Sequence, residues 1–359
     1  MISACWVLSA IVLAGPISLR DGGSIERERV RAFTAQGVEL AIGFDPGSIS
    51  DRSLVPWAEV RSIEGGWGDA ERYRPVADAV WRATVRLDRG DAAGAGAVLE
   101  PISGMYLNEQ GPTSGTIAGV LTATRLLGGD RPGAVRAWLA ARSNSVSGDS
   151  YWIDSATGLC TALPPIFRPE ESASILEMGA AEGDTPVGGL RALYLAAASV
   201  SAGKAAVLPE LTARQRSDAG LRLVLDITRA GTEAEPAARE AAREALLRRL
   251  RAGGPAWETA WIHLGIGLSM MRETDPQTRD AGASRLVTVV IEHQHTAPGL
   301  SELARDLLID YFVATGRPEY EAAVRSMDRA ALLGLAPWRV ERPDEETQTG
   351  TPMPDEESP

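Results

Sequence analysis

The fold is decided by Arg86-Leu87-Asp88-Arg89-Gly90-Asp91-Ala92-Ala93-Gly94-Ala95, which is repeated 39 residues later as Arg125-Leu126-Leu127-Gly128-Gly129-Asp130-Arg131-Pro132-Gly133-Ala134. In each copy a Gly-Asp pair interrupts a stretch rich in Ala, Leu and Arg, as a tight turn between two helices does. Small or apolar residues then follow at steps of four and three, which place them on one helix face: Ala95, Leu99 and Ile102, then Ala134, Trp138 and Ala141.

The same composition continues over residues 74–338, so we expect one α-helical repeat domain there. A helical hairpin cannot bury its own apolar face, and stacked hairpins therefore share a continuous core and leave a concave surface. The sequence predicts a mainly α protein, an α-solenoid of helical hairpins.

Two further stretches carry a family resemblance. Trp261-Ile262-His263-Leu264-Gly265-Ile266-Gly267-Leu268 and Tyr320-Glu321-Ala322-Ala323-Val324-Arg325-Ser326-Met327-Asp328-Arg329-Ala330 resemble the first and second helices of a tetratricopeptide repeat. Leu268 stands where Tyr is usual, Met327 takes the aromatic position, and the spacing of 39–42 residues exceeds the usual 34. The resemblance covers residues 74–143 and 256–335 and implies a divergent, tetratricopeptide-like solenoid.

Residues 28–65 have a different pattern, in which short apolar runs alternate with polar residues. Asp45-Pro46-Gly47 forms a turn between two of these runs. We expect a three- or four-stranded β-meander, which is too small to be stable without docking on another element. It is interpreted as a cap on the helical body, or alternatively as a ligand-binding β-module.

The first 18 residues contain an apolar run followed by small residues and Pro16, which is typical of a signal peptide. An uncleaved anchor and a buried first helix are the alternatives. The run is too short to span a bilayer, so we expect no integral membrane span in the mature chain. The protein is predicted to be exported, to the periplasm or beyond the cell.

Two segments interrupt or follow the repeats. Residues 144–167 lack helical periodicity but are rich in apolar and aromatic residues, and they are predicted to be a loop insertion that either contacts a ligand or plugs an open end of helices. Residues 341–359 hold seven acidic residues and one Arg and are expected to be a disordered acidic tail.

The stretch 233–252 is predicted to be a helix with clear end signals. Thr232 and Glu235 suggest a capping box, Pro236 suits the first turn, and Gly253 follows the last. The Arg and Glu residues of this helix are interpreted as a solvated face of i,i+4 pairs.

Common catalytic and metal-binding motifs are missing from the sequence, and no enzyme activity, cofactor or metal is predicted. His293 and His295 are interpreted as a solvated helix end and His263 as a hydrogen-bonding residue between helices. Ser201 and Lys204, the sole lysine, match the Ser-x2-Lys spacing of serine enzymes but lack the companion elements.

The remaining candidates are aromatic. Trp81, Trp138, Trp257 and Trp261 are expected in the core, whereas Trp67 and Trp152 lie in predicted loops and are the better binding candidates. With Tyr151 and Asp154 they form the speculative binding set. Cys160 is interpreted as a half-buried apolar residue.

The 36 basic and 48 acidic residues give a net charge of −12, so nucleic acid is not expected as a partner. We expect a non-catalytic exported protein that binds a protein or peptide partner and acts as an interaction or envelope scaffold. A cell-wall-directed hydrolase with its site at residues 144–167, and a structural oligomer subunit, are the alternatives.

Overall fold

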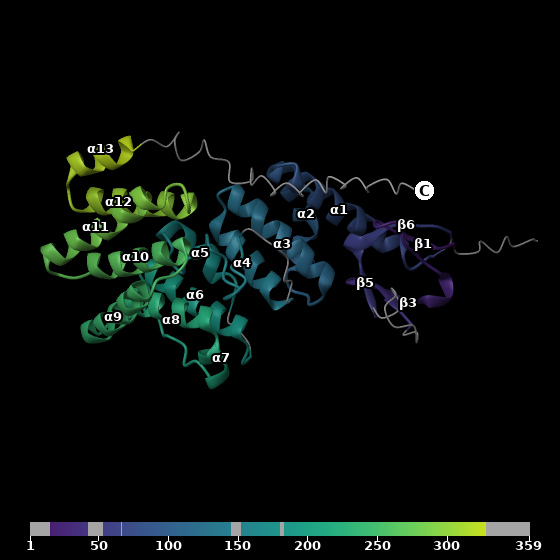
Figure 1. Ribbon diagram of the computed structural model, residues 1–359, viewed down its shortest axis with the longest axis horizontal. Coiled ribbons are helices and arrows are strands. Elements are labelled where there is room, and N and C mark those ends of the chain that lie inside the picture. Colours follow the sequence, from purple (N-terminus) through teal and green to yellow (C-terminus); the bar gives the residue numbers. More distant parts are fainter. Residues whose placement is uncertain (1–14, 42–52, 66, 145–151, 180–182, 328–359) are drawn as a thin grey trace, which may run out of the picture.

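The computed structural model describes five stretches of the chain: residues 15–41, 53–65, 67–144, 152–179 and 183–327. Within them the chain is mainly helical, with 64% helix and 13 α-helices, and a small antiparallel sheet region precedes the helices. Figure 1 shows the strands at one end of an elongated molecule and the last helix at the other. The prediction of a mainly α protein with a small N-terminal β-element is confirmed at this level.

The helices are α1 (Arg74–Asp88), α2 (Ala92–Tyr106), α3 (Pro112–Leu127), α4 (Arg131–Ser143), α5 (Pro169–Leu176), α6 (Pro186–Ser201), α7 (Ala213–Ser217), α8 (Ala219–Thr232), α9 (Pro236–Ala252), α10 (Ala256–Met271), α11 (Pro276–Glu292), α12 (Pro298–Ala314) and α13 (Pro318–Ser326). The strands are β1 (Ile17–Leu19), β2 (Ser24–Ile25), β3 (Val30–Thr34), β4 (Gly37–Leu40), β5 (Leu54–Pro56) and β6 (Val60–Ile63).

The strands form two three-stranded antiparallel sheets, in the orders β2-β1-β6 and β3-β4-β5. Only the second sheet is a meander, because β1 pairs with the last strand and places Ile17 opposite Ile63. The prediction of a single meander over residues 28–65 is therefore wrong in topology and in extent. The cause is that β1 and β2 are very short, and β1 overlaps the end of the apolar N-terminal run.

The predicted boundary of the signal peptide at residue 18 falls inside β1. Ile17 is fully buried, and Ser18 pairs with both Ser24 and Ser62. Cleavage after residue 18 would remove two of the three residues of this central strand. Residues 1–14 lie outside the described part of the chain.

The β-element docks on the start of α3 through the turn between β3 and β4. Gln36 Oε1 accepts a hydrogen bond from the Ser114 backbone N–H at 3.0 Å, and Thr113 Oγ1 donates to the Gln36 carbonyl at 2.7 Å. The first backbone N–H groups of a helix have no partner within the helix, so Gln36 caps α3 from a different element. Gly111 precedes α3, and a Cβ there would overlap the Gln36 side chain.

The two turns singled out in the sequence have matching geometry. Gly90 and Gly129 adopt left-handed φ values of +80° and +78°, and each ends a helix. Asp91 and Asp130 then cap the next helix by accepting a backbone N–H three residues on, at 2.8 and 2.9 Å. The expected bends between α1 and α2 and between α3 and α4 are confirmed, because a left-handed glycine ends one helix and an Asp begins the next.

The helices share two apolar clusters that meet at α4. Ala137 and Ala140 belong to the cluster formed with α1–α3, whereas Trp138 and Leu139 belong to the larger cluster that continues to α13. α4 thus has an apolar face on each side, and it joins the N-terminal hairpins to the rest of the helical body.

The described part of the predicted insertion packs into the larger cluster. Leu159, Cys160 and Leu163 are fully buried, and Ile153 pairs with Cys160 in an isolated antiparallel bridge. Residues 152–167 therefore fill space between helices. The predicted acidic tail at 341–359 lies outside the described residues.

Two local predictions were wrong. Thr232 is the last residue of α8, where its hydroxyl donates to the Thr228 carbonyl, so Glu235 is the N-cap of α9 and makes no side-chain cap bond. Trp81, expected in the core, is 43% exposed and lies 4.6 Å from the Arg20 guanidinium. Local sequence patterns did not show that α8 extends to Thr232 or that α1 turns Trp81 outward.

Candidate functional site

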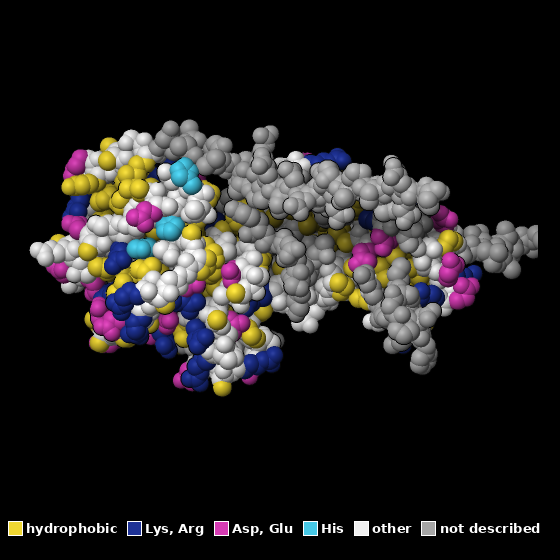
Figure 2. All heavy atoms as spheres, viewed as in Figure 1, with side chains coloured by type: hydrophobic (Ala, Val, Ile, Leu, Met, Phe, Trp, Pro, Cys, Tyr) yellow, Lys and Arg dark blue, Asp and Glu magenta, His cyan; other side chains and the backbone are white. Residues whose placement is uncertain are grey.

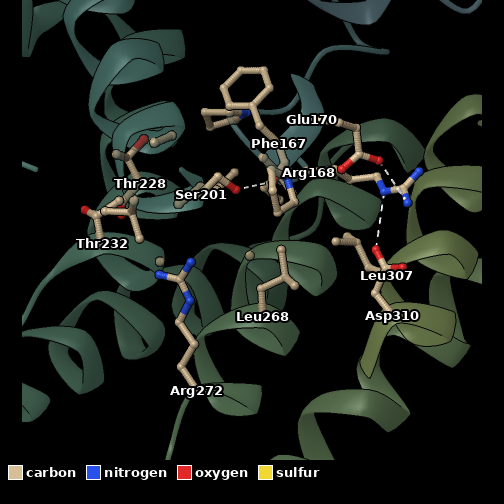
Figure 3. A pocket seen from close by; sticks show the side chains of 18 residues that line it. Phe167, Arg168, Glu170, Ser201, Thr228, Thr232, Leu268, Arg272, Leu307 and Asp310 are labelled. Atoms are coloured by element: carbon tan, nitrogen blue, oxygen red, sulfur yellow. Dashed lines mark hydrogen bonds and ion pairs between the residues drawn. The ribbon is translucent and has the colours of Figure 1, made fainter. Parts of the chain in front are cut away.

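A cavity of about 490 Å³ lies where the segment 165–170 meets α6, α8, α10 and α12. Figure 3 shows side chains from all of these elements around it. These elements are far apart in sequence, so the cavity exists only in the folded chain. Concave, mainly apolar sites of this size are the usual form of ligand pockets.

Apolar side chains form the walls. Phe167, Leu268, Leu307 and Ile227 line the cavity and also belong to the larger apolar cluster or pack against it. Gly265 lets α8 and α10 approach closely, because a Cβ at this position would lie 3.1 Å from Ile227 Cγ2. The walls are therefore held by the packing of the helical body and offer an apolar surface.

Three hydroxyl groups line one side of the cavity. Ser201 donates to the Phe167 carbonyl, Thr228 to the Val224 carbonyl and Thr232 to the Thr228 carbonyl. Because each hydroxyl proton is already used, these oxygens are left with lone pairs that can accept hydrogen bonds. The arrangement suits Ser201 to a structural role, since its proton is held by a backbone carbonyl, while Lys204 lies exposed in the turn after α6.

Arg168 lies at one end of the cavity and is neutralised by carboxylates. Its guanidinium lies 2.9 Å from Glu170, 3.3 Å from Asp310 and 3.6 Å from Asp306. Figure 3 shows Arg168 between Glu170 and Asp310, both of which face it. This end of the cavity has no unpaired positive charge.

Arg272 differs from Arg168. Figure 3 shows its guanidinium pointing into the cavity beside Thr228 and Thr232. Within the described residues it makes no side-chain hydrogen bond or ion pair. Removal of water lowers the pKa of Arg272, and nearby Arg239 lowers it further, although the residue as a whole remains exposed. A guanidinium stays protonated in proteins, so the cavity contains an uncompensated positive charge.

The neighbouring Glu273 explains why Arg272 has no partner among the described residues. Glu273 pairs with Arg239 at 3.1 Å and with Arg243 at 2.7 Å, both from α9. These hydrogen bonds hold the pKa of Glu273 below its ordinary value. The carboxylate closest in sequence to Arg272 therefore ties α9 to the end of α10.

The charges on α9 are arranged differently from the predicted solvated face. Arg239 and Arg243 reach Glu273, and Arg249 reaches Glu258 of α10. Within α9 itself, Arg243 also pairs with Glu240, and Arg248 pairs with Glu244 at 3.9 Å. Figure 2 shows basic and acidic side chains mixed over this part of the molecule. Most of these pairs cross between elements because α9 packs against α10.

The structure does not bring the predicted binding residues together. Trp67 belongs to the core of the β-element, where its Nε1 donates to the Gly15 carbonyl at 2.9 Å and its ring lies edge-on to Phe33. Trp152 packs against the larger helical cluster. Tyr151 lies outside the described residues. The predicted set therefore does not form one site.

Asp154 closes a turn. Its Oδ1 accepts hydrogen bonds from the Thr157 backbone N–H at 2.8 Å and from Thr157 Oγ1 at 2.7 Å. Trp152 has a different setting, because it lines a smaller cavity of about 230 Å³ together with Trp257. Of the predicted set, Trp152 is the residue found at a cavity.

The nucleophile and histidine candidates are also placed by the fold. Cys160 is fully buried, not half-buried as predicted. Because burial raises the pKa of its thiol to about 12, Cys160 stays protonated. His293 is 7% exposed, which contradicts the predicted solvated position, whereas His295 is exposed. Burial lowers the pKa of both His263 and His293, and Arg285, 3.5 Å from His263 Nδ1, lowers that of His263 further.

Comparison with protein-family models, with curated proteins and with solved structures gives no match for this chain. Among the described residues, no helix is both long enough and apolar enough to cross a membrane. In the same part of the chain, no three His, Cys, Asp or Glu side chains are grouped so that they could hold a metal ion. We therefore infer the function from the geometry of the chain itself.

Sequence reasoning missed the residues that matter most in the cavity. Arg272 follows Met270-Met271 at the end of α10 and carries no local signal. Phe167 lies at the end of the predicted insertion, so the prediction that residues 144–167 contact a ligand did include one residue of the cavity. Arg239 and Arg243 of α9 pair with Glu273, which lies outside their helix. The sequence does not show that these pairs form.

Proposed function

We propose that this protein is a non-catalytic, exported helical-repeat protein that captures a protein partner, in the manner of an interaction or envelope scaffold. The proposal includes a solenoid arrangement of tetratricopeptide-like hairpins. Its structural support is that successive helices pack against one another in chain order, from α1 to α4 and again from α10 to α13. The apolar N-terminal run supports export.

One observation carries the proposal: the apolar cavity contains the unpaired guanidinium of Arg272. A partner segment with apolar side chains would bury them against Leu268 and Leu307, at roughly 25 cal/mol per Å² of apolar surface. A carboxylate on the same segment would pair with Arg272 through charge-assisted hydrogen bonds, which are stronger than bonds between neutral groups. The site therefore favours an apolar peptide segment with an acidic group.

Photo-crosslinking tests this proposal. A benzoylphenylalanine placed at Leu307 should form a cross-link with a partner from an envelope extract, and mass spectrometry should identify an apolar segment with a carboxylate. Arg272→Gln should lower the yield roughly tenfold, as expected for loss of a charge-assisted hydrogen bond. Arg248→Gln, an exposed arginine of α9 outside the cavity, is the matched control and should leave the yield unchanged.

Two outcomes would contradict the proposal. One is a cross-linked partner whose yield is the same in Arg272→Gln and in the wild type. The other is a cross-linked segment without a carboxylate. Circular dichroism of each variant shows whether a loss of yield reflects loss of fold.

A further inference from the structure

A second cavity, of about 280 Å³, lies between the segment 107–110, the outer end of α4 and the start of α6. It shares no lining residue with the apolar cavity. Polar side chains dominate its lining, including Arg136 from α4 and Arg191 from α6. These two helices contact each other, so the two arginines reach one cavity from adjacent elements.

Neither arginine has a partner in the described part of the chain. Arg136 and Arg191 make no side-chain hydrogen bond or ion pair there, and Arg191 Nε is buried without any acceptor. The other arginines of α4 are different, since Arg131 pairs with Glu171 at 2.9 Å and Arg142 with Asp218 at 3.0 Å. Arg136 is exposed and free to turn toward a ligand, whereas the buried, unpaired Nε of Arg191 calls for an explanation.

The other polar groups around this cavity do not neutralise them. Glu109 is the carboxylate in the lining, and its Oε2 accepts a hydrogen bond from Gln36 Nε2 at 3.0 Å. Asn144 is engaged on both sides, because its Oδ1 accepts from the Gly111 N–H and its Nδ2 donates to the Ala140 carbonyl. Glu109 keeps its negative charge in this bond, but two guanidinium groups against one carboxylate leave the described lining with a net positive charge.

We infer that this cavity is an oxyanion site that takes a phosphoryl group, either inorganic phosphate or a small phosphate ester. Planar guanidinium groups donate two parallel hydrogen bonds to phosphate oxygens. The compact ammonium group of a lysine cannot provide this geometry. The start of α6 also borders the cavity at Gly188 and adds the positive end of a helix dipole. The volume greatly exceeds the roughly 30 Å³ of one water, so it leaves room for an ester group.

Isothermal titration calorimetry of the full chain with inorganic phosphate and with methyl phosphate tests the inference. We expect saturable binding, and a Kd roughly tenfold weaker in Arg136→Gln and in Arg191→Gln, from loss of a charge-assisted hydrogen bond. Arg191→Lys keeps the charge but loses the planar fork and should bind with intermediate affinity. Arg214→Gln, at an exposed arginine of α7 that does not line the cavity, should bind as the wild type does.

Each result decides the inference. Tighter binding of methyl phosphate indicates an ester as the source of the phosphoryl group, and tighter binding of inorganic phosphate indicates the free ion. The inference is overturned if neither probe gives saturable heat with the wild type. Equal affinity in the wild type and in the Arg136→Gln/Arg191→Gln double variant, or equally tight binding of acetate, would overturn it as well.

Discussion

The helices α1–α4 and the helices α5–α12 differ in what fills the space between them. Turns of a few residues join α1 to α2 and α3 to α4, and these helices pack closely around a core made largely of Ala, Val, Leu and Ile. The connector 152–168 that leads into the second region buries Leu159, Cys160 and Leu163 among the helices, and Tyr194 and Trp261 fill further space together with Trp138 of α4. The apolar cavity lies in this second region.

This difference explains why the apolar cavity lies in the second region. A short turn forces two helices into contact along their length, so small side chains are enough to fill the interface. A long connector lets helices separate, and the gap is then filled by the connector itself and by large aromatic side chains. Where that filling stops, beside Phe167, the cavity remains open.

The largest effect on stability is expected from Trp261→Ala, which removes a buried ring from the core of the second region. Trp261 is fully buried, and its Nε1 donates to the Thr161 carbonyl of the connector at 2.8 Å. The free energy of unfolding should fall by about 3–5 kcal/mol, measured by urea denaturation, because a large buried ring leaves a cavity. Trp81→Ala, at a 43% exposed position, is the control and should cost about 1 kcal/mol or less. Equal losses in the two variants would mean that the connector is not held by Trp261.

The next effect tests the short turns of the first region. Gly90→Ala and Gly129→Ala should each lower the free energy of unfolding by about 1–2 kcal/mol, since a Cβ is strained at left-handed φ. Gly119→Ala, in the interior of α3 with open space around its Cα, should instead raise it by about 0.5–1 kcal/mol. Thermal and urea unfolding measure the decrease and the increase in the free energy of unfolding. A Gly129→Ala variant that is more stable than the wild type would refute the turn geometry.

A smaller effect concerns the join between the β-element and the first region. Gln36→Ala removes the side chain that caps α3, and it should lower the free energy of unfolding by about 1 kcal/mol. Hydrogen exchange at the Ser114 amide should become faster in the same variant. Gln110→Ala, an exposed glutamine near the same helix end, is the matched control. Unchanged exchange at Ser114 would show that the β-element does not cap α3.

The smallest effect is a pH dependence in the second region. The pKa values of His263 and His293 are lower in the folded chain than the ordinary 6.5, so the unfolded chain binds more protons below that pH. Stability should be complete above pH 6.5 and should decrease as the pH falls through the window below it. Urea midpoints across this window should depend less on pH in His263→Gln/His293→Gln than in the exposed control His295→Gln. A midpoint that rises on acidification would contradict the assigned burial.

Helix ends were the most predictable part of the fold, because they depend on neighbouring residues. Gly90-Asp91 and Gly129-Asp130 were sufficient to place two bends, and Pro236 and Gly253 marked the two ends of α9. Predictions failed where tertiary contacts overruled a local pattern. Trp81 faces outward beside Arg20 instead of entering the core, and Thr232 remains within α8.

The sequence alone determined the helical class and the positions of the hairpin turns, because a left-handed glycine and a capping Asp act within a few residues of backbone. Only the tertiary structure decided where the cavities lie and which arginines stay unpaired. Arg272 faces its cavity alone because Glu273 is drawn to Arg239 and Arg243 of α9, and that competition depends on how helices distant in sequence pack together.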